Sequence, residues 1–243
     1  MTTTHEMTPI GTVHSCFPDK FGVPRQPTLC PNARGRIALT PPWDDPDCFR
    51  GLEAFSHIWL TFVFHEVPPS RKPRPLVRPP RLGGNTRVGV FASRSPFRPN
   101  RLGLSLVRQE GLFRHNGDLC LAIAEIDLVD GTPVLDIKPH LPWCDSRTDA
   151  TGAWAEAAPQ PHLSVNYSDS ARQQLETLAP DYPSLEPLIG EVLRQDPRPA
   201  YHAGRDSART YALSLFDLDI HWRVTGSVCE VCAIRPRSPP SQV

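Results

Sequence analysis

The sequence predicts a mainly β protein in which a large β domain precedes a small α+β domain. Proline is abundant, at 29 of 243 residues, and it divides the chain into short segments that suit strands better than long helices. Up to residue 143, apolar segments rich in β-branched and aromatic residues alternate with turn signals such as HNGD and VDGTP. Beyond residue 164 a helical periodicity appears. The spacing of the first strands indicates a barrel or a sandwich.

The β domain is expected to span residues 1–145. Segments such as IWLTFVF and LCLAIAEIDLV have the composition of strands that pack into a core. A D-G turn separates the last two expected strands. In chain order, we expect strands over residues 10–14, 36–40, 57–66, 87–92, 102–113, 119–129 and 133–140.

Residues 146–163 are small, polar and proline-containing, which indicates a linker. The α+β domain then covers 164–237. We expect a helix over 170–179, strands over 209–216, 219–224 and 227–234, and a disordered tail over 238–243. A second helix is predicted by apolar residues at helical spacing, which are Leu185, Leu188, Ile189, Val192 and Leu193.

Composition excludes several classes of protein. No apolar run approaches the roughly 20 residues that cross a bilayer, and the polar start MTTTHEMTP lacks the features of a secretory signal, so we expect a cytoplasmic protein without a membrane partner. Seven irregularly spaced cysteines argue against a disulfide framework. Cys229 and Cys232 form a single CxxC. Without a second pair this is a weak zinc signal, and on a strand the two thiols would face opposite sides, so we expect no metal.

The charge is unevenly distributed although the net charge is zero. From Arg71 to Arg101 there are eight arginines and one lysine but no acidic residue. The guanidinium fork suits phosphates and carboxylates. A solvated loop is the alternative explanation, and arginine outnumbers lysine 23 to 3 in the whole chain, so a general preference for arginine accounts for part of the pattern.

Nucleotide-binding motifs of the common kinds are absent. No G-x-G-x-x-G follows a strand and opens a helix, and GGNTRVG lacks that context. A phosphate-binding loop that ends in Gly-Lys-Ser/Thr is also missing, which argues against an NTPase.

Four stretches carry the residues with chemical potential. FGVPRQP (21–27) presents Arg25 and Gln26 between prolines, and FSHIWLTFVFHE (55–66) ends a core strand with His65 and Glu66. GVFASRSPFRPNRLGLS (89–105) is a turn-rich arginine loop that suits an anion. DLVDGTPVLDIKPHLPW (127–143) has three aspartates that either shape the turn or hold a cationic sulfonium or a ribose.

These stretches, together with VRPPRLGGNTRVGVFA (77–92), closely resemble the tRNA N6-threonylcarbamoyladenosine methyltransferase family of YaeB-like proteins. The resemblance covers residues 10–142 and extends through QDPRPAYHAGRD and YALSLFDLDIHWRV. It implies a single-sheeted antiparallel β-barrel that binds S-adenosylmethionine, a small C-terminal domain and a homodimer. The implied reaction methylates N6 of the threonylcarbamoylated adenosine immediately 3′ of the anticodon in certain tRNAs, including threonine tRNA.

The resemblance also implies site residues. The family often has Gln in place of Glu66 and a Pro-Ile pair in place of Arg101 and Leu102, so the pattern departs there. The donor site implied is Pro24, Arg25, Gln26, His65, Glu66, Arg94, Leu104, Asp130, Gly131, Thr132 and Pro133.

The reaction needs a base and contacts to anions. The N6 proton must leave during or before attack, and residue type and motif position make His65, Glu66 and Asp136 the candidate bases. We expect Arg94, Arg98 and Arg101 to divide the carboxylate and phosphate contacts. Contacts to the tRNA backbone and anticodon loop are expected from Arg71, Arg74, Arg78, Arg81, Arg87, Arg198, Tyr201 and Arg205.

Two other readings of the sequence stay open. A non-catalytic RNA-binding barrel would also carry basic loops. A methyltransferase for a different nucleoside or small molecule would use the same donor site. Specific donor binding separates the first alternative from an enzyme.

Overall fold

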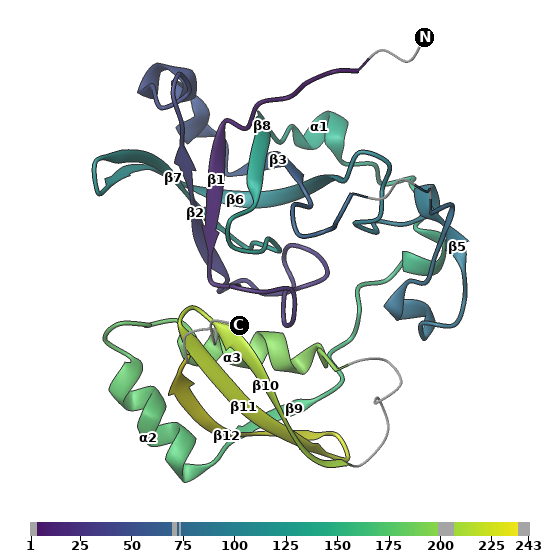
Figure 1. The fold of residues 1–243 in the computed structure, drawn as a ribbon, viewed down its shortest axis with the longest axis vertical. Coiled ribbons are helices and arrows are strands. Elements are labelled where there is room, and N and C mark those ends of the chain that lie inside the picture. The colour runs from purple at the N-terminus through teal and green to yellow at the C-terminus, as the bar shows by residue number, and fades with distance from the viewer. Residues whose placement is uncertain (1–3, 70–71, 73, 199–206, 238–243) are drawn as a thin grey trace.

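The structure is a computed structural model that describes residues 4–69, 72, 74–198 and 207–237. It is mainly β, as predicted, and has two parts (Figure 1). The first part of the chain forms a closed sheet, and the last part forms a smaller sheet with two helices. Across the described residues, no helix is both long and apolar enough to span a membrane. The expected tail 238–243 lies outside the described residues.

The larger sheet is a closed barrel in the order β1-β2-β7-β6-β3-β8, and all of its neighbouring strands are antiparallel. The seam between β1 and β8 is short, with Gly11 opposite Val134 and Thr12 opposite Pro133. The strands are β1 (Gly11–Ser15), β2 (Arg34–Leu39), β3 (His57–Val63), β6 (Leu102–His115), β7 (Asp118–Ala124) and β8 (Pro133–Pro139).

The barrel core is formed by every second side chain of its strands. In β3, Ile58, Leu60 and Phe62 are buried and point inward, while the residues between them are partly exposed. Phe62 lies opposite Gly103 on β6, where a Cβ would come within 2.2 Å of the phenylalanine ring. Glycine is therefore required at residue 103, because the ring occupies the space of its missing side chain.

One predicted strand is wrong. Residues 87–92 form only the short strand β5 (Val88–Gly89), which pairs with β4 (Leu76–Val77), and then a 3-10 turn over Val90–Ala92. Prolines flank β4 and cannot donate to a ladder, so the pairing does not extend. The strand predicted over 119–129 also stops at Ala124, because Glu125 has a left-handed backbone and its N–H donates to the carbonyl of Ala33.

The smaller sheet has the order β10-β11-β12-β9. Its parallel edge strand β9 begins directly after the expected linker and was not predicted. Ser168 caps α2 by accepting a hydrogen bond from the Ala171 N–H, and α3 buries the apolar face that its spacing predicts. The elements are β9 (Ser164–Tyr167), α2 (Asp169–Leu178), α3 (Leu185–Arg194), β10 (Ser207–Leu215), β11 (Leu218–Thr225) and β12 (Val228–Pro236).

The two cysteines of the CxxC pair lie on β12. Cys229 is buried and Cys232 is only partly buried, and the register of β12 against β11 shifts between Val231 and Ala233. Burial raises the pKa of the Cys229 thiol to about 12. Within the described residues, no group of three or more His, Cys, Asp or Glu side chains is arranged to hold a metal ion.

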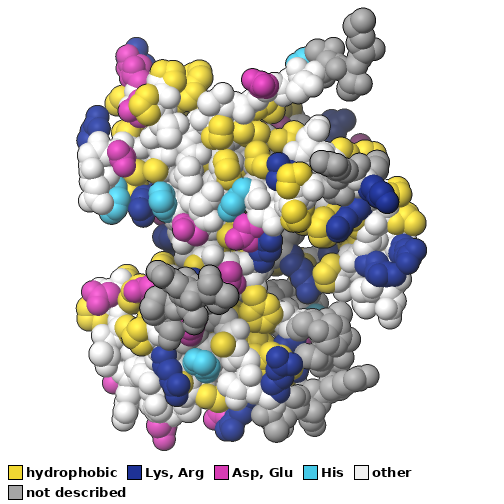
Figure 2. Space-filling model, viewed as in Figure 1, with side chains coloured by type: hydrophobic (Ala, Val, Ile, Leu, Met, Phe, Trp, Pro, Cys, Tyr) yellow, Lys and Arg dark blue, Asp and Glu magenta, His cyan; other side chains and the backbone are white. Residues whose placement is uncertain are grey.

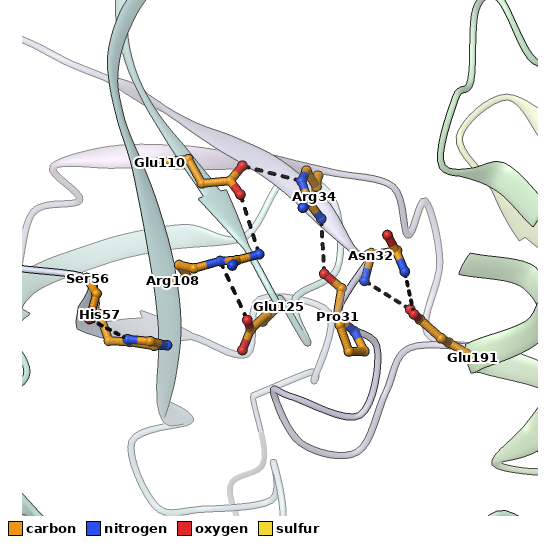
Figure 3. A network of polar contacts seen from close by, with 9 residues as sticks. All are labelled: Pro31, Asn32, Arg34, Ser56, His57, Arg108, Glu110, Glu125 and Glu191. Atoms are coloured by element: carbon orange, nitrogen blue, oxygen red, sulfur yellow. Dashed lines mark hydrogen bonds and ion pairs between the residues drawn. The ribbon is translucent and has the colours of Figure 1, made fainter. Parts of the chain in front are cut away.

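The loop between β1 and β2 connects the barrel to the second part. Its Cys16 carbonyl accepts from the Phe216 N–H at 2.8 Å. The Glu191 carboxylate of α3 accepts from the backbone and side chain of Asn32 at 3.0 and 2.5 Å (Figure 3). Next to this contact, the barrel surface carries a row of ion pairs, which joins Arg34, Glu110, Arg108 and Glu125 (Figure 3). The end of the barrel that contains this loop therefore lies against the smaller sheet and its helices (Figure 1).

Candidate active site

The D-G turn before β8 lies at the seam of the barrel. The Asp130 carboxylate accepts from the Ser15 N–H at 2.9 Å, and the Gly131 N–H donates to the Val13 carbonyl at 2.8 Å. Thr132 is buried and its hydroxyl donates to the Val129 carbonyl at 2.6 Å. These bonds fix the turn to β1, so its backbone geometry is set before any ligand binds.

His65 lies beside this turn. The Gly131 backbone has a φ of 77°, which favours glycine, and a Cβ there would be 3.7 Å from the His65 Nε2. Glu66 is exposed, and Lys20 binds it twice, with Nζ 3.3 Å from its carboxylate and 2.6 Å from its carbonyl oxygen. Lys20 was not predicted, because it is 46 residues from Glu66 in the sequence.

The arginine loop meets the loop between β1 and β2. Arg94 donates to the side-chain oxygen of Gln26, whose amide nitrogen donates to the Arg25 carbonyl. Pro24 is buried, whereas the Arg25 side chain is exposed. Gln26 and Arg94, one predicted residue from each loop, are therefore in direct contact.

Asp127 has the most perturbed carboxyl in this region. Its carboxylate accepts from the buried Ser105 hydroxyl at 2.7 Å. Burial raises the pKa of Asp127 to about 6, although the Ser105 hydrogen bond and the positive charge of Arg94 oppose the rise. Strongly perturbed carboxyls with a specific charge partner are typical of functional sites. The sequence indicated Asp127 only as one of three aspartates around the turn.

Leu104 and Asp136 lie on the outer face of the barrel. Both are opposite Thr61 of β3, whose neighbours Leu60 and Phe62 point inward. A bulge at Leu135 changes the alternation of β8, which turns Asp136 outward although Val134 is buried. Asp136 is half exposed and lies 3.7 Å from the Lys138 ammonium group. The Asp136 side chain thus points away from the barrel core.

Arg98 and Arg101 are engaged by backbone carbonyls. Arg98 donates to the Ser93 carbonyl at 2.6 Å and to the Val90 carbonyl at 3.4 Å, and Arg101 donates to the Val67 carbonyl at 2.9 Å. Both side chains are partly buried. These arginines shape the loop, a role that counting charges in the sequence does not distinguish from phosphate binding.

The other arginines of the basic stretch are exposed. Lys and Arg side chains gather around β5, with hydrophobic side chains between them (Figure 2). Arg74 lies over the Phe97 ring at 4.4 Å, and Arg81 donates to the Ala157 carbonyl of the expected linker. Arg78 and Arg87 are exposed as well. Arg71 lies outside the described residues.

The expected RNA contacts of the second part are placed differently. Arg198 is buried and donates through Nε and Nη2 to the Asp196 carboxylate at 2.7 and 2.8 Å. A guanidinium group in this position is not presented to a phosphate. The left-handed backbone of Asp196 turns its carboxylate onto the arginine two residues later. Tyr201 and Arg205 lie outside the described residues.

Comparisons with known proteins cover both parts of the chain. Residues 12–146 match the tRNA-methyltransferase O N-terminal domain, and residues 160–237 match the TrmO C-terminal domain. The chain is 49% identical to the Escherichia coli protein named tRNA (adenine(37)-N6)-methyltransferase over 94% of this chain and 97% of that protein. It is also 49% identical to a Pseudomonas aeruginosa protein named putative S-adenosylmethionine-dependent methyltransferase RcsF, over 90% of this chain and 92% of that protein.

A solved structure is similar in fold as well as in sequence. The crystal structure of TrmO from Pseudomonas aeruginosa superposes with a TM-score of 0.79 at 38% identity, over 96% of this chain and 98% of that one. Three findings lead to one assignment. They are the match to two consecutive family domains, the identity over nearly the whole chain and the shared fold. The chain belongs to the tRNA-methyltransferase O family.

Proposed function

We propose that this protein transfers a methyl group from S-adenosylmethionine to N6 of the threonylcarbamoylated adenosine immediately 3′ of the anticodon of tRNA. The observation that carries the proposal is the match to both domains of one tRNA methyltransferase family. The names of the Escherichia coli and Pseudomonas aeruginosa relatives supply the acceptor atom and the methyl donor. Residues 1–145 would form the donor-binding domain and residues 164–237 a second domain, joined by 146–163.

The residues at the end of the barrel fit such a donor. S-adenosylmethionine supplies an electrophilic methyl group on a cationic sulfonium, and it also carries a carboxylate, an ammonium group and an adenosine. Arg25 and Arg94 provide cations for the carboxylate, and the carboxyl of Asp127, which senses the charge of Arg94, provides an oxygen acceptor. The Gly131 position has no side chain, which leaves the backbone of the turn accessible beside His65.

We assign the donor site to the two loops and the turn. Leu104, which is exposed on the outer face, would supply an apolar contact. The residues that would hold the donor are Pro24, Arg25, Gln26, His65, Glu66, Arg94, Leu104, Asp130, Gly131, Thr132 and Pro133, and we add Asp127.

His65 and Glu66 are the stronger candidates for the base. The N6 atom is flanked by a purine ring and a carbonyl, which delocalise its lone pair, so loss of its proton assists attack. His65 is partly buried beside the fixed turn, and Glu66 is held by Lys20. Asp136 is half exposed and paired with Lys138, so we rank it third.

The exposed arginines around β5 would contact the tRNA backbone, since polyanion binding needs several accessible cations. They are Arg74, Arg78, Arg81 and Arg87. Membership of the family also leads us to propose a homodimer that works in the cytoplasm.

The test is transfer of labelled methyl from S-adenosylmethionine to tRNA prepared with and without the threonylcarbamoyl group, followed by nucleoside analysis. We expect label only in the carbamoylated nucleoside. Label in another nucleoside would replace the acceptor that we propose. Donor binding without transfer to either tRNA would indicate a small-molecule acceptor, and absence of donor binding would favour the non-catalytic RNA-binding module.

A further inference from the structure

Phe91 is an exposed aromatic residue in the middle of the basic stretch. It lies in the 3-10 turn Val90–Ala92, and 77% of its surface is exposed, although the preceding Val90 is buried. Burying a phenylalanine side chain is favourable by roughly 1.5–3 kcal/mol, so a ring left in water gives up that stabilisation. The ring is therefore accessible to a ligand that could cover it.

The turn holds the ring in a fixed position. The Arg98 guanidinium donates to the carbonyls of Val90 and Ser93, which flank Phe91 on both sides, and its central carbon lies 5.9 Å from the ring centroid. The Ser93 hydroxyl donates to the Val90 carbonyl at 2.9 Å and closes the turn. The ring is thus preorganised, with a cation near it, and a flat partner that covers it loses little further conformational entropy from the protein.

A second aromatic residue of the same loop has the same arrangement. Phe97 is partly exposed, and the Arg74 guanidinium lies 4.4 Å from the centroid of its ring. Two aromatic rings, each with a neighbouring guanidinium group, therefore lie in one loop, whose ends are tied by the bond from Arg101 to the Val67 carbonyl.

The surrounding charge selects a polyanion as the partner. No acidic residue occurs from 67 to 109, and exposed arginines surround β4 and β5 (Figure 2). The methyl donor carries a single carboxylate, which does not require so many cations. An isologous contact between two copies of this chain that was centred on this loop would bring its arginines close to those of the other copy, and these charges repel each other. Flat rings among accessible cations fit single-stranded RNA, whose bases stack on aromatic side chains while its phosphates meet arginine.

We propose that Phe91 is a stacking platform for an unpaired base of the RNA substrate, with Arg98 holding the ring in place. The inference rests on the proposed function, because it assumes an RNA acceptor, and it adds a base contact that the arginines alone do not provide. Stacking is tolerant of base identity, so the platform contributes affinity and positioning rather than base-specific recognition.

The test compares Phe91→Ala, Phe91→Trp and the control Phe113→Ala. Phe113 lies near the end of β6, outside the basic stretch, and is 39% exposed. The measurement is binding of a fluorescent anticodon stem-loop by anisotropy at several salt concentrations. We expect Phe91→Ala to weaken binding about 5- to 150-fold, which is the range for loss of one stacked base, with an unchanged slope against log salt concentration because no phosphate contact is lost. Phe91→Trp should retain affinity, and its added fluorescence should be quenched on binding.

Two results would overturn the inference while leaving the proposed function intact. In the first, the wild-type protein binds and methylates RNA, but Phe91→Ala binds as tightly as Phe113→Ala. In the second, Phe91→Ala leaves RNA affinity unchanged but alters another property. A change in donor affinity would assign the ring to the donor site, and a change in the dimer fraction measured by sedimentation would assign it to a contact with a second copy of the chain. If the wild-type protein neither binds nor methylates RNA, the proposed function itself fails.

Discussion

Replacement of Asp127 by asparagine should make the protein more stable at alkaline pH and less active. The amide is nearly isosteric with the carboxyl, and its oxygen still accepts from the Ser105 hydroxyl. What changes is the charge. Burial raises the pKa of Asp127 from 3.8 to about 6, so the folded state prefers the protonated form by about 3 kcal/mol, at about 1.4 kcal/mol per pKa unit.

The sign follows from the number of protons bound by each state. Between pH 4 and pH 6 the folded protein keeps the Asp127 proton that the unfolded chain releases, so the free energy of unfolding falls as the pH rises through this window. Asp127→Asn does not titrate there. We therefore expect the variant to match the wild-type protein near pH 4 and to exceed its stability by about 3 kcal/mol at pH 8.

Urea unfolding at pH 4, 5, 6, 7 and 8 measures this difference, because titration of all other groups cancels between the two proteins. Asp118→Asn, at the exposed first residue of β7, is the control and should show no pH-dependent difference. A constant difference between Asp127→Asn and wild type from pH 4 to pH 8 would refute the argument from burial. Reduced methyl transfer by the more stable variant would show that the Asp127 carboxylate, which lowers stability at pH 8, is needed for activity.

Three further predictions concern packing and charge. Gly103→Ala places a methyl group against the Phe62 ring, so the free energy of unfolding in urea should fall by about 1–3 kcal/mol, and Phe62→Leu in the same chain should restore part of it. Asp196→Ala leaves the buried Arg198 without its carboxylate and should cost about 3–5 kcal/mol in the same assay; a loss below 1 kcal/mol would mean that the pair is not buried in solution. Arg94→Gln removes the guanidinium group that we assign to the donor carboxylate and should weaken donor binding by about 10- to 100-fold in calorimetry, whereas unchanged affinity would place the donor elsewhere.

Local patterns in the sequence predicted the strands well where side-chain periodicity alone decides the structure. The apolar run in β3 and the helical spacing of α3 are examples, because each must bury one face wherever it packs. The prediction failed at strand ends. The apolar run that follows His57 continues through Phe64, but β3 ends at Val63. The Phe64 N–H still donates to the Arg101 carbonyl, next to the Val63–Leu102 pair, but Arg101 has a left-handed backbone with a φ of 54°, so the pairing with β6 stops there.

The candidate site was predictable as motifs but not as contacts. The turn at Asp130 and the loop at Arg94 are visible in the sequence because each is a short run of turn-forming residues. The pairing of Lys20 with Glu66 and of Ser105 with Asp127 depends on how the barrel closes, and no local pattern encodes it. Arg198 was predicted from the sequence to bind phosphate, but in the structure its guanidinium group binds the Asp196 carboxylate instead.

The distinction between structural and available arginines yields a last prediction. Arg98 donates to two backbone carbonyls of its own loop, whereas Arg78 is exposed on the same basic surface. Arg78→Gln should weaken RNA binding and lower the slope of log affinity against log salt by about 0.7–0.9, because one phosphate contact is lost. Arg98→Gln should weaken binding through loss of loop order, with an unchanged slope. Equal slopes in both variants would show that burial of the guanidinium does not decide which arginines meet the RNA.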